Sequence, residues 1–274
     1  MFKKTIASKS FPAPFDTSHV TQQQLRSIAS GNPFLNYMDL SQNHPDICRM
    51  QSIADNLTTF YQSIKPPRNL PGDIELLFPQ KDPQVIELVK KFLKKYFNDN
   101  KPRHLMLGIN PGRFGAGITG VNFTGPRQLK ENCGIDHHLG LSSELSAEFI
   151  YEMIAEYGGA NRFYHEWFIG AVCPLGFIKD GKNINYYDDK KLSHAVTPFI
   201  IECIDKQLSM GFNTDKCICI GGEKNFKFLS GLNNHHKWFG EIVPLPHPRF
   251  ILQYRRKQKD QYIHQYLSAL RFAG

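Results

Sequence analysis

The sequence predicts a three-layer α/β/α fold, in which helices cover both faces of a central four-stranded parallel sheet, preceded by a helical N-terminal extension. Two observations lead to this prediction. Short apolar runs typical of buried strands alternate along the chain with longer segments that repeat apolar residues at helical spacing. Unusual Asn, His, Pro and Gly residues directly follow the first and the fourth of these runs, at the strand ends where parallel sheets bind ligands.

The N-terminal extension is expected over residues 1–70, and the main domain over residues 71–274. The first part of the extension carries scattered Pro, Ser, Gln and Asn, with one helical run over 52–64. Pro66, Pro67 and Pro71 follow this run and mark a break in the chain.

Asp82 and Pro83 predict the start of the next helix, because they suit its N-cap and its first turn. Apolar side chains then recur at helical spacing, with lysines between them: Ile86, Val89, Leu93 and Tyr96 on one face, and Lys90, Lys91, Lys94 and Lys95 on the other. We interpret the lysines as a solvated face; a DNA contact is the alternative.

The remaining strands and helices follow in order along the chain. The four apolar runs predict strands over 104–109, 167–173, 217–220 and 241–245. Further helices are expected over 145–157, where Gly158 and Gly159 stop the pattern, from Thr197 and Pro198 towards Gly211, and over 258–270.

Charge and hydropathy indicate which partners the protein can have. The chain has 33 Lys and Arg against 25 Asp and Glu, a formal charge of +8, which suits a polyanionic partner such as nucleic acid. No stretch approaches the roughly 20 apolar residues of a membrane span. The first residues also lack the long apolar run of a signal peptide. We therefore expect a cytoplasmic protein without a membrane partner.

The cysteines and histidines do not form the pattern of a metal site. No two of the six cysteines have Cys-x-x-Cys spacing, so we interpret them as buried reduced thiols. The pairs His137–His138 and His235–His236 are the alternative metal ligands, but adjacent histidines in polar turns are usually exposed. We expect no metal and no cofactor.

The segment over 108–125 is a candidate functional loop. It reads Gly-Ile-Asn-Pro-Gly-Arg-Phe-Gly-Ala-Gly-Ile-Thr-Gly-Val-Asn-Phe-Thr-Gly, which is too rich in glycine for a packed element and too aromatic for a linker. It is not a phosphate-binding Walker loop, since no Gly-Lys-Ser/Thr follows, and its glycines do not have dinucleotide-binding spacing. An irregular connection with glycines at positive φ is the alternative.

This segment resembles the single-strand-selective monofunctional branch of the uracil-DNA glycosylase superfamily. Residues 108–115 are similar to the branch's Gly-Met-Asn-Pro-Gly-Pro-Phe-Gly, and residues 119–123 to its Thr-Gly-Val-Pro-Phe. His247 and Pro248 match the start of its His-Pro-Ser-Pro-Arg loop, and residues 173–175 match its Cys-Pro-Leu. The resemblance extends from about Leu77 to Leu270 and implies a uracil-DNA glycosylase-like fold.

The resemblance implies a monofunctional DNA glycosylase of base excision repair. Such an enzyme flips a damaged base out of DNA and hydrolyses its N-glycosidic bond; here we expect removal of uracil and of other deaminated or modified bases. The expected partner is single- or double-stranded DNA with a damaged base, bound by a monomer. Lys130, the nearest lysine after Phe123, has no motif that places it at the sugar, so we expect no lyase step.

Two alternative functions remain open at this point. One is a module of the same fold that binds damaged or single-stranded DNA without catalysis. The other is an enzyme that acts on free nucleosides or RNA, because a fold does not determine a substrate.

The resemblance assigns the catalytic roles to Asn110 and His247. Asn110 orients the water, and His247 donates a hydrogen bond to the carbonyl of the departing base. An amide is a poor general base, so stabilisation of the leaving group must carry most of the catalysis. Phe123 is expected to stack on the flipped base. The full set of implied base-binding residues is Gly108, Ile109, Gly112, Phe114, Phe123 and Ala171.

Two base-binding positions differ from the pattern of the superfamily. Ala171 stands where relatives carry the asparagine that reads uracil, which puts strict uracil specificity in doubt. Gly112 stands where classical uracil-specific relatives carry a tyrosine that excludes a 5-methyl group. We expect this glycine to leave room for a substituent or a larger base.

The loop after His247 also differs, because Arg, Phe and Ile follow Pro248 where the branch has Ser, Pro and Arg. An apolar side chain can still fill the space that a flipped nucleotide leaves in the stack. The expected DNA-binding residues are Pro248, Arg249, Phe250, Ile251 and Arg255.

Overall fold

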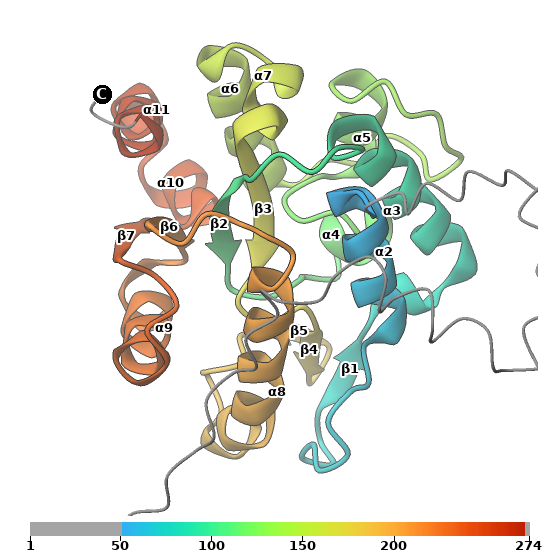
Figure 1. Ribbon diagram of the computed structural model, residues 1–274, viewed down its shortest axis with the longest axis vertical. Helices are drawn as coiled ribbons and strands as arrows, with labels where there is room; N and C mark the ends of the chain where they lie inside the picture. Colours follow the sequence, from blue (N-terminus) through green and yellow to red (C-terminus); the bar gives the residue numbers. More distant parts are fainter. Residues whose placement is uncertain (1–50, 272–274) are drawn as a thin grey trace, which may run out of the picture. The chain divides into compact units, whose positions relative to one another are not determined.

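The computed structural model describes residues 51–271, shown in Figure 1. The predicted N-terminal extension therefore lies outside the described residues up to residue 50. The rest of it contains helix α2 (Ile53–Ser63), which begins at a capping box: Ser52 Oγ accepts a hydrogen bond from Asp55 N, and Ser52 N donates one to the Asp55 carboxylate. Buried side chains of α2 belong to the same hydrophobic cluster as those of α3 (Pro83–Tyr96).

The central sheet has four parallel strands in the order β3 (Trp167–Ala171), β2 (His104–Gly108), β6 (Lys216–Ile220) and β7 (Glu241–Leu245). The register sets Gly108 beside Ala171 at the end of β2 and β3. Together with the helices that cover it, the sheet confirms the predicted α/β/α fold (Figure 1).

The longer helices of this fold are α3, α6 (Leu145–Tyr157), α8 (Lys190–Leu208), α9 (Gly222–His236) and α11 (Lys259–Leu270). Shorter ones are α4 (Ala116–Thr119), α5 (Pro126–Glu131), α7 (Ala160–Glu166) and α10 (Pro248–Tyr254), with 3-10 turns at Pro79–Lys81 and Arg256–Gln258. Two predicted helix ends are confirmed: the Asp82 side chain caps α3, and α6 ends at Gly158 in the left-handed region. No helix in residues 51–271 is long and apolar enough to cross a membrane.

The prediction that Thr197 and Pro198 begin a helix is wrong. Helix α8 starts at Lys190, because the Asp189 carboxylate accepts hydrogen bonds from the backbone N–H groups of Lys191 and Leu192. Pro198 lies inside the helix, where it removes one backbone donor. The helix continues past it because buried side chains lie on both sides of the proline in sequence.

A second, antiparallel sheet was not predicted. It contains β1 (Glu75–Leu77), β4 (Gly176–Lys179) and β5 (Lys182–Ile184) in the order β1-β4-β5. Each strand has three or four residues, which is too short for an alternating pattern to stand out. The hairpin of β4 and β5 follows the β3 end of the central sheet directly in the chain, so it lies near the strand ends.

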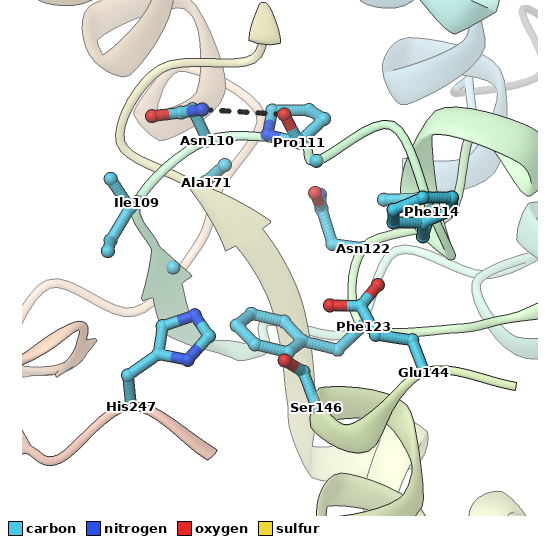
Figure 2. Close-up of a pocket in the computed structure, with 13 residues that line it drawn as sticks. Ile109, Asn110, Pro111, Phe114, Asn122, Phe123, Glu144, Ser146, Ala171 and His247 are labelled. Atoms are coloured by element: carbon cyan, nitrogen blue, oxygen red, sulfur yellow. Dashed lines mark hydrogen bonds between the residues drawn. The ribbon is translucent and has the colours of Figure 1, made fainter. Parts of the chain in front are cut away.

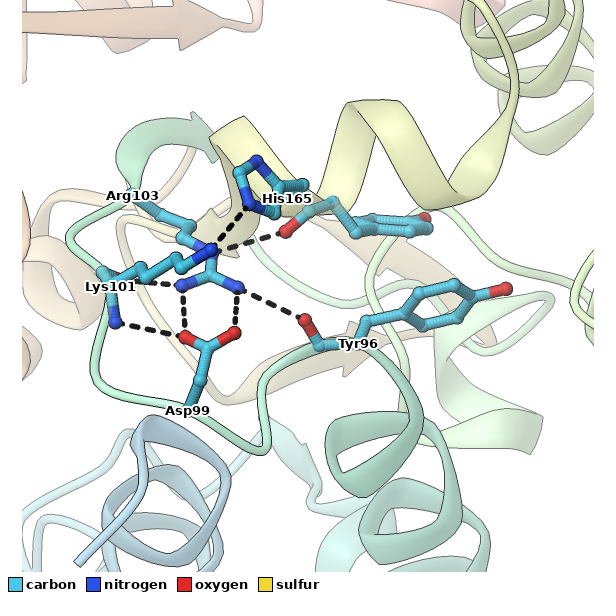
Figure 3. A network of polar contacts seen from close by, with 6 residues as sticks. Tyr96, Asp99, Lys101, Arg103 and His165 are labelled. Atoms are coloured by element: carbon cyan, nitrogen blue, oxygen red, sulfur yellow. Dashed lines mark hydrogen bonds and ion pairs between the residues drawn. The ribbon is translucent and has the colours of Figure 1, made fainter.

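A buried arginine joins the segment between α3 and β2 to neighbouring elements, as Figure 3 shows. Arg103 donates to the Asp99 carboxylate, at 3.0 Å for Nη2, and to the backbone carbonyls of Tyr96 and Tyr164. The hydrogen bonds that Arg103 donates to the carboxylate lower the pKa of Asp99 to about 2. Because its donors are taken up by protein groups, Arg103 stabilises the fold rather than serving a polyanion.

Candidate active site

A pocket opens at the carboxyl ends of β2 and β3, bordered by the start of α10 (Figure 2). Its enclosed volume is about 50 Å³, and about 400 Å³ when the open space at its mouth is included. Its lining contains Gly108, Ile109, Asn110, Pro111, Gly112, Phe114, Ala116, Asn122, Phe123, Glu144, Ser146, Ala171 and His247.

The structure brings all the predicted catalytic and base-binding residues into this one pocket, although their roles stay predictions. It also adds lining residues that the sequence reasoning missed: Pro111, Ala116, Asn122, Glu144 and Ser146. Asn122 had a signal, because it lies within the matched motif at a position where the branch has proline. Glu144 and Ser146 had none, since they reach the pocket only through the placement of α6.

Phe123 is held in a conformation that phenylalanine rarely adopts. Its φ is 52°, in the left-handed region. The Thr119 hydroxyl fixes this turn by donating to Thr124 O at 2.6 Å and accepting from Val121 N at 3.2 Å. A Cβ at Gly108 would lie 2.6 Å from Phe123 Cε2, so only glycine lets the ring lie against the end of β2. Gly108 therefore serves the pocket by making room for the phenylalanine ring.

The Asn110 amide is oriented by backbone groups at the end of β5 and directly after it. Its Oδ1 accepts from Tyr186 N at 3.1 Å, and its Nδ2 donates to Ile184 O at 3.3 Å. These partners define which end of the amide is oxygen. The Tyr186 hydroxyl in turn donates to Asn225 at 2.6 Å, which anchors the segment to α9. Oδ1 keeps a second lone pair with which to hold a water.

His247 is a neutral hydrogen-bond donor. It caps α10, and its Nδ1 accepts from Arg249 N at 3.1 Å, so the neutral ring carries its proton on Nε2. Burial, and secondarily the charge of Arg249, lower the pKa of His247 from its ordinary 6.5 to about 4. The ring centroid lies 5.8 Å from that of Phe123, which places the N–H donor beside the aromatic platform.

An NMR titration is expected to show this state directly. Because burial disfavours the charged ring, the His247 ring should stay neutral from about pH 8 down to about pH 5, with Nδ1 unprotonated and the proton on Nε2. The lowered pKa also means that the unfolded chain binds this proton more readily, so stability falls as the pH drops from 6.5 towards 4. A titration midpoint of His247 near pH 6.5, or a neutral ring with its proton on Nδ1, would contradict this protonation state. The NMR signals of the His247 ring are identified by their absence from the spectrum of His247→Asn.

A neighbouring side chain lies beside Gly112. A Cβ at Gly112 would lie 3.1 Å from the side-chain nitrogen of Asn183, on β5. The Asn183 amide is held there because its oxygen accepts from Arg113 N at 3.2 Å. The Asn183 side chain therefore fills the direction in which a side chain at position 112 would point, while Gly112 itself lines the pocket, and the room expected for a larger base stays a prediction.

Glu144 and His247 are the titratable side chains of the pocket lining. Burial raises the pKa of Glu144, while the nearby Ser146 hydroxyl and the charge of Arg249 oppose the rise. The Glu144 carboxyl occupies the space over Gly115, whose φ is 62° and which carries no side chain. In residues 51–271, no group of three or more His, Cys, Asp and Glu is placed to hold a metal ion.

The residues predicted to bind DNA lie on and beside α10. Phe250 is 42% exposed, Arg249 and Arg255 are exposed, and the Arg255 guanidinium lies 5.8 Å from the Phe250 ring centroid. Pro248 and Ile251 are buried, so their prediction as DNA contacts is wrong. The segment is a helix rather than a loop, and its apolar side turns inward. Tyr254, which was not predicted, is 61% exposed and packs near Phe250.

Comparisons with known proteins agree with this architecture. The sequence model of the family described as "Uracil DNA glycosylase superfamily" matches residues 94–271. The crystal structure of wild-type SMUG2 from Pedobacter heparinus is similar to this chain, with 46% sequence identity and a TM-score of 0.77. The match covers 80% of this chain and 97% of the SMUG2 chain. No curated protein matches.

Proposed function

Because this chain belongs to the uracil-DNA glycosylase superfamily and is a DNA glycosylase, we propose that it is a monofunctional enzyme that flips a damaged base out of DNA and hydrolyses its N-glycosidic bond. The observation that carries the proposal is the gathering of Asn110, Phe123 and His247 around one pocket. A water position, an aromatic platform and a neutral N–H donor are the groups that this hydrolysis needs.

The proposed mechanism divides the work among these three residues. Phe123 stacks on the flipped base, which holds it by its π-face. As the bond between C1′ and the base nitrogen breaks, its electron pair moves into the base, and His247 Nε2–H stabilises the charge on a base carbonyl. Asn110 Oδ1 holds the water that forms the new C–O bond at C1′. The proton of this water passes to solvent, because an amide cannot keep it.

We propose that the substrates are uracil and further deaminated or modified bases in single- or double-stranded DNA. The support is Ala171, which is buried at the end of β3 and offers only a methyl group to the pocket. The formal charge of +8 favours a DNA partner. We place this activity in base excision repair, carried out by a cytoplasmic monomer.

A panel of oligonucleotides that each carry one lesion tests this proposal. With uracil, hypoxanthine, xanthine and 5-hydroxymethyluracil, we expect release of uracil and of at least one other base, xanthine or the 5-substituted uracil first. Ala171→Asn should shift the ratio of rates towards uracil, because it adds an amide to the wall of the pocket. Binding without release of any base would indicate a non-catalytic module, and release of uracil alone would contradict the broad substrate range.

Phe250 is proposed to fill the space that the flipped nucleotide leaves, assisted by Arg249. The expected result is that Phe250→Ala slows uracil excision from duplex DNA more than from a single strand, because a single strand loses less stacking on flipping. Single-turnover rates on the same sequence in both forms measure this. Equal slowing on the two substrates would exclude the wedge role. Tyr254→Ala, which removes the exposed neighbouring ring, shows whether the effect is specific to Phe250.

A further inference from the structure

The pocket contains a side-chain amide that the proposed mechanism does not use. Asn122 precedes Phe123 and lines the pocket; in Figure 2 its amide lies between Pro111 and Phe123 and points towards Pro111. It is half-buried, so it is within reach of a ligand while partly shielded from water. Among the lining side chains, Asn110 and Asn122 are the two amides, and Asn110 is fixed by the backbone of residues 184–186.

One hydrogen bond ties the Asn122 amide to the strand that carries Ala171. Asn122 Nδ2 donates to the backbone carbonyl of Ile169, on β3, at 3.4 Å. The bonded carbonyl belongs to the residue two positions before Ala171 in this strand, and Asn122 and Ala171 both line the pocket. The amide therefore lines the same pocket as Ala171, which offers only a methyl group.

The remaining polar atoms of this amide are available. In the described part of the chain, Asn122 Oδ1 accepts no hydrogen bond, and Nδ2 donates only the long one to Ile169. The free oxygen and the second N–H present one acceptor and one donor. Exchanging the oxygen and nitrogen of the amide by a 180° flip would place Oδ1 next to the Ile169 carbonyl oxygen, and two acceptors repel each other. The positions of the acceptor and the donor are therefore fixed.

We propose that Asn122 reads the hydrogen-bonding edge of the flipped base. Its ligand is a nucleobase in which a ring N–H lies beside a carbonyl, as in uracil and xanthine. The ring N–H donates to Oδ1, and the carbonyl accepts from Nδ2. Cytosine presents the reverse order, a ring nitrogen acceptor beside an amino donor, so it meets a mismatched amide. This inference rests on the proposed function and names the group that selects its substrates.

Removal of this amide should leave the turn around it intact. The backbone of residues 119–124 is held by the hydroxyls of Thr119 and Thr124, and the Asn122 side chain makes none of these bonds. Asn122→Ala therefore tests recognition. Asn122→Asp keeps the shape and removes the donor. Asn234→Ala, at an exposed position of α9, is the matched control.

The experiment measures binding without turnover. Oligonucleotides carry 2′-fluoro-2′-deoxyuridine or 2′-fluoro-2′-deoxycytidine, which resist hydrolysis, or a tetrahydrofuran abasic analogue. The wild-type protein is expected to bind the uridine form roughly tenfold to a hundredfold more tightly than the cytidine form, the range of a bidentate base contact. Asn122→Ala and Asn122→Asp should each lose most of this preference with unchanged affinity for the abasic analogue, and Asn234→Ala should keep it.

Uracil excision by the same proteins separates the two proposals. If wild type excises uracil and Asn122→Ala keeps the full preference for the uridine form, the role of Asn122 is overturned and the proposed function stands. If wild type shows the preference, Asn122→Ala loses it and no protein excises any base, the proposed function fails and the role of Asn122 stands. If the wild-type protein does not bind the uridine form more tightly than the cytidine form, the role of Asn122 is also overturned.

Discussion

Asn110→Ala is expected to slow uracil excision by roughly a hundredfold or more while DNA affinity stays nearly unchanged. The amide is the group placed to hold the attacking water, and its orientation is fixed by Tyr186 N and Ile184 O. A methyl group cannot position that water, so the loss should fall on the rate of the bound complex. Single-turnover rates at saturating enzyme measure it, and anisotropy with an abasic analogue measures binding.

The same substitution leaves Tyr186 N without its acceptor, so the loss of activity must be separated from loosening of this segment. Asn225→Ala provides the comparison, because it removes the hydrogen bond of the Tyr186 hydroxyl but leaves the Asn110 amide in place. We expect a lower melting temperature for both variants and the large loss of rate for Asn110→Ala alone. Wild-type excision by a folded Asn110→Ala protein would exclude Asn110 from catalysis.

His247→Ala is expected to cause a loss of similar size, roughly a hundredfold or more, because it removes the donor that stabilises charge on the departing base. The histidine also caps α10 through Nδ1, so alanine costs about 0.5–2 kcal/mol of stability in addition. His247→Asn separates the two effects: asparagine is a good N-cap, but its side chain is too short to reach the base.

We therefore expect His247→Asn to be as inactive as His247→Ala and nearly as stable as wild type. Chemical denaturation and single-turnover excision on the same preparations give the two quantities. If His247→Asn kept the wild-type rate, the histidine would matter only as a helix cap, and another group would have to stabilise the leaving base.

The sequence was sufficient for those parts of the fold whose signals are local. Asp82 and Pro83 begin α3 as predicted, and the apolar runs of β2, β3 and β6 are buried as predicted, whereas in β7 only Leu245 is buried. Helix α9 was missed because Asn225 and Leu229 are its only buried residues, which gives no apolar stripe. Pro198 was wrongly predicted to begin a helix, because the capping of α8 by Asp189, nine residues earlier, outweighs one missing backbone donor.

The candidate site was predictable where a motif carries it, and not where tertiary packing builds it. Asn110, Phe123 and His247 follow from the order of the motifs, and the structure gathers them. The Asn183 side chain that fills the space beside Gly112 comes from a strand too short to predict. Ile251 was assigned to DNA because the sequence does not show that α10 is helical from Pro248 onward and turns this side chain inward.

The central claim is that this pocket hydrolyses the N-glycosidic bond of a damaged base and stops there. It is tested most directly by incubating the purified full chain with an excess of a uracil-containing oligonucleotide and measuring both products. The account predicts one free uracil for each abasic site, in a strand that stays intact until alkali is added. Uracil left in the DNA at every enzyme concentration, or strand cleavage without alkali, would contradict it.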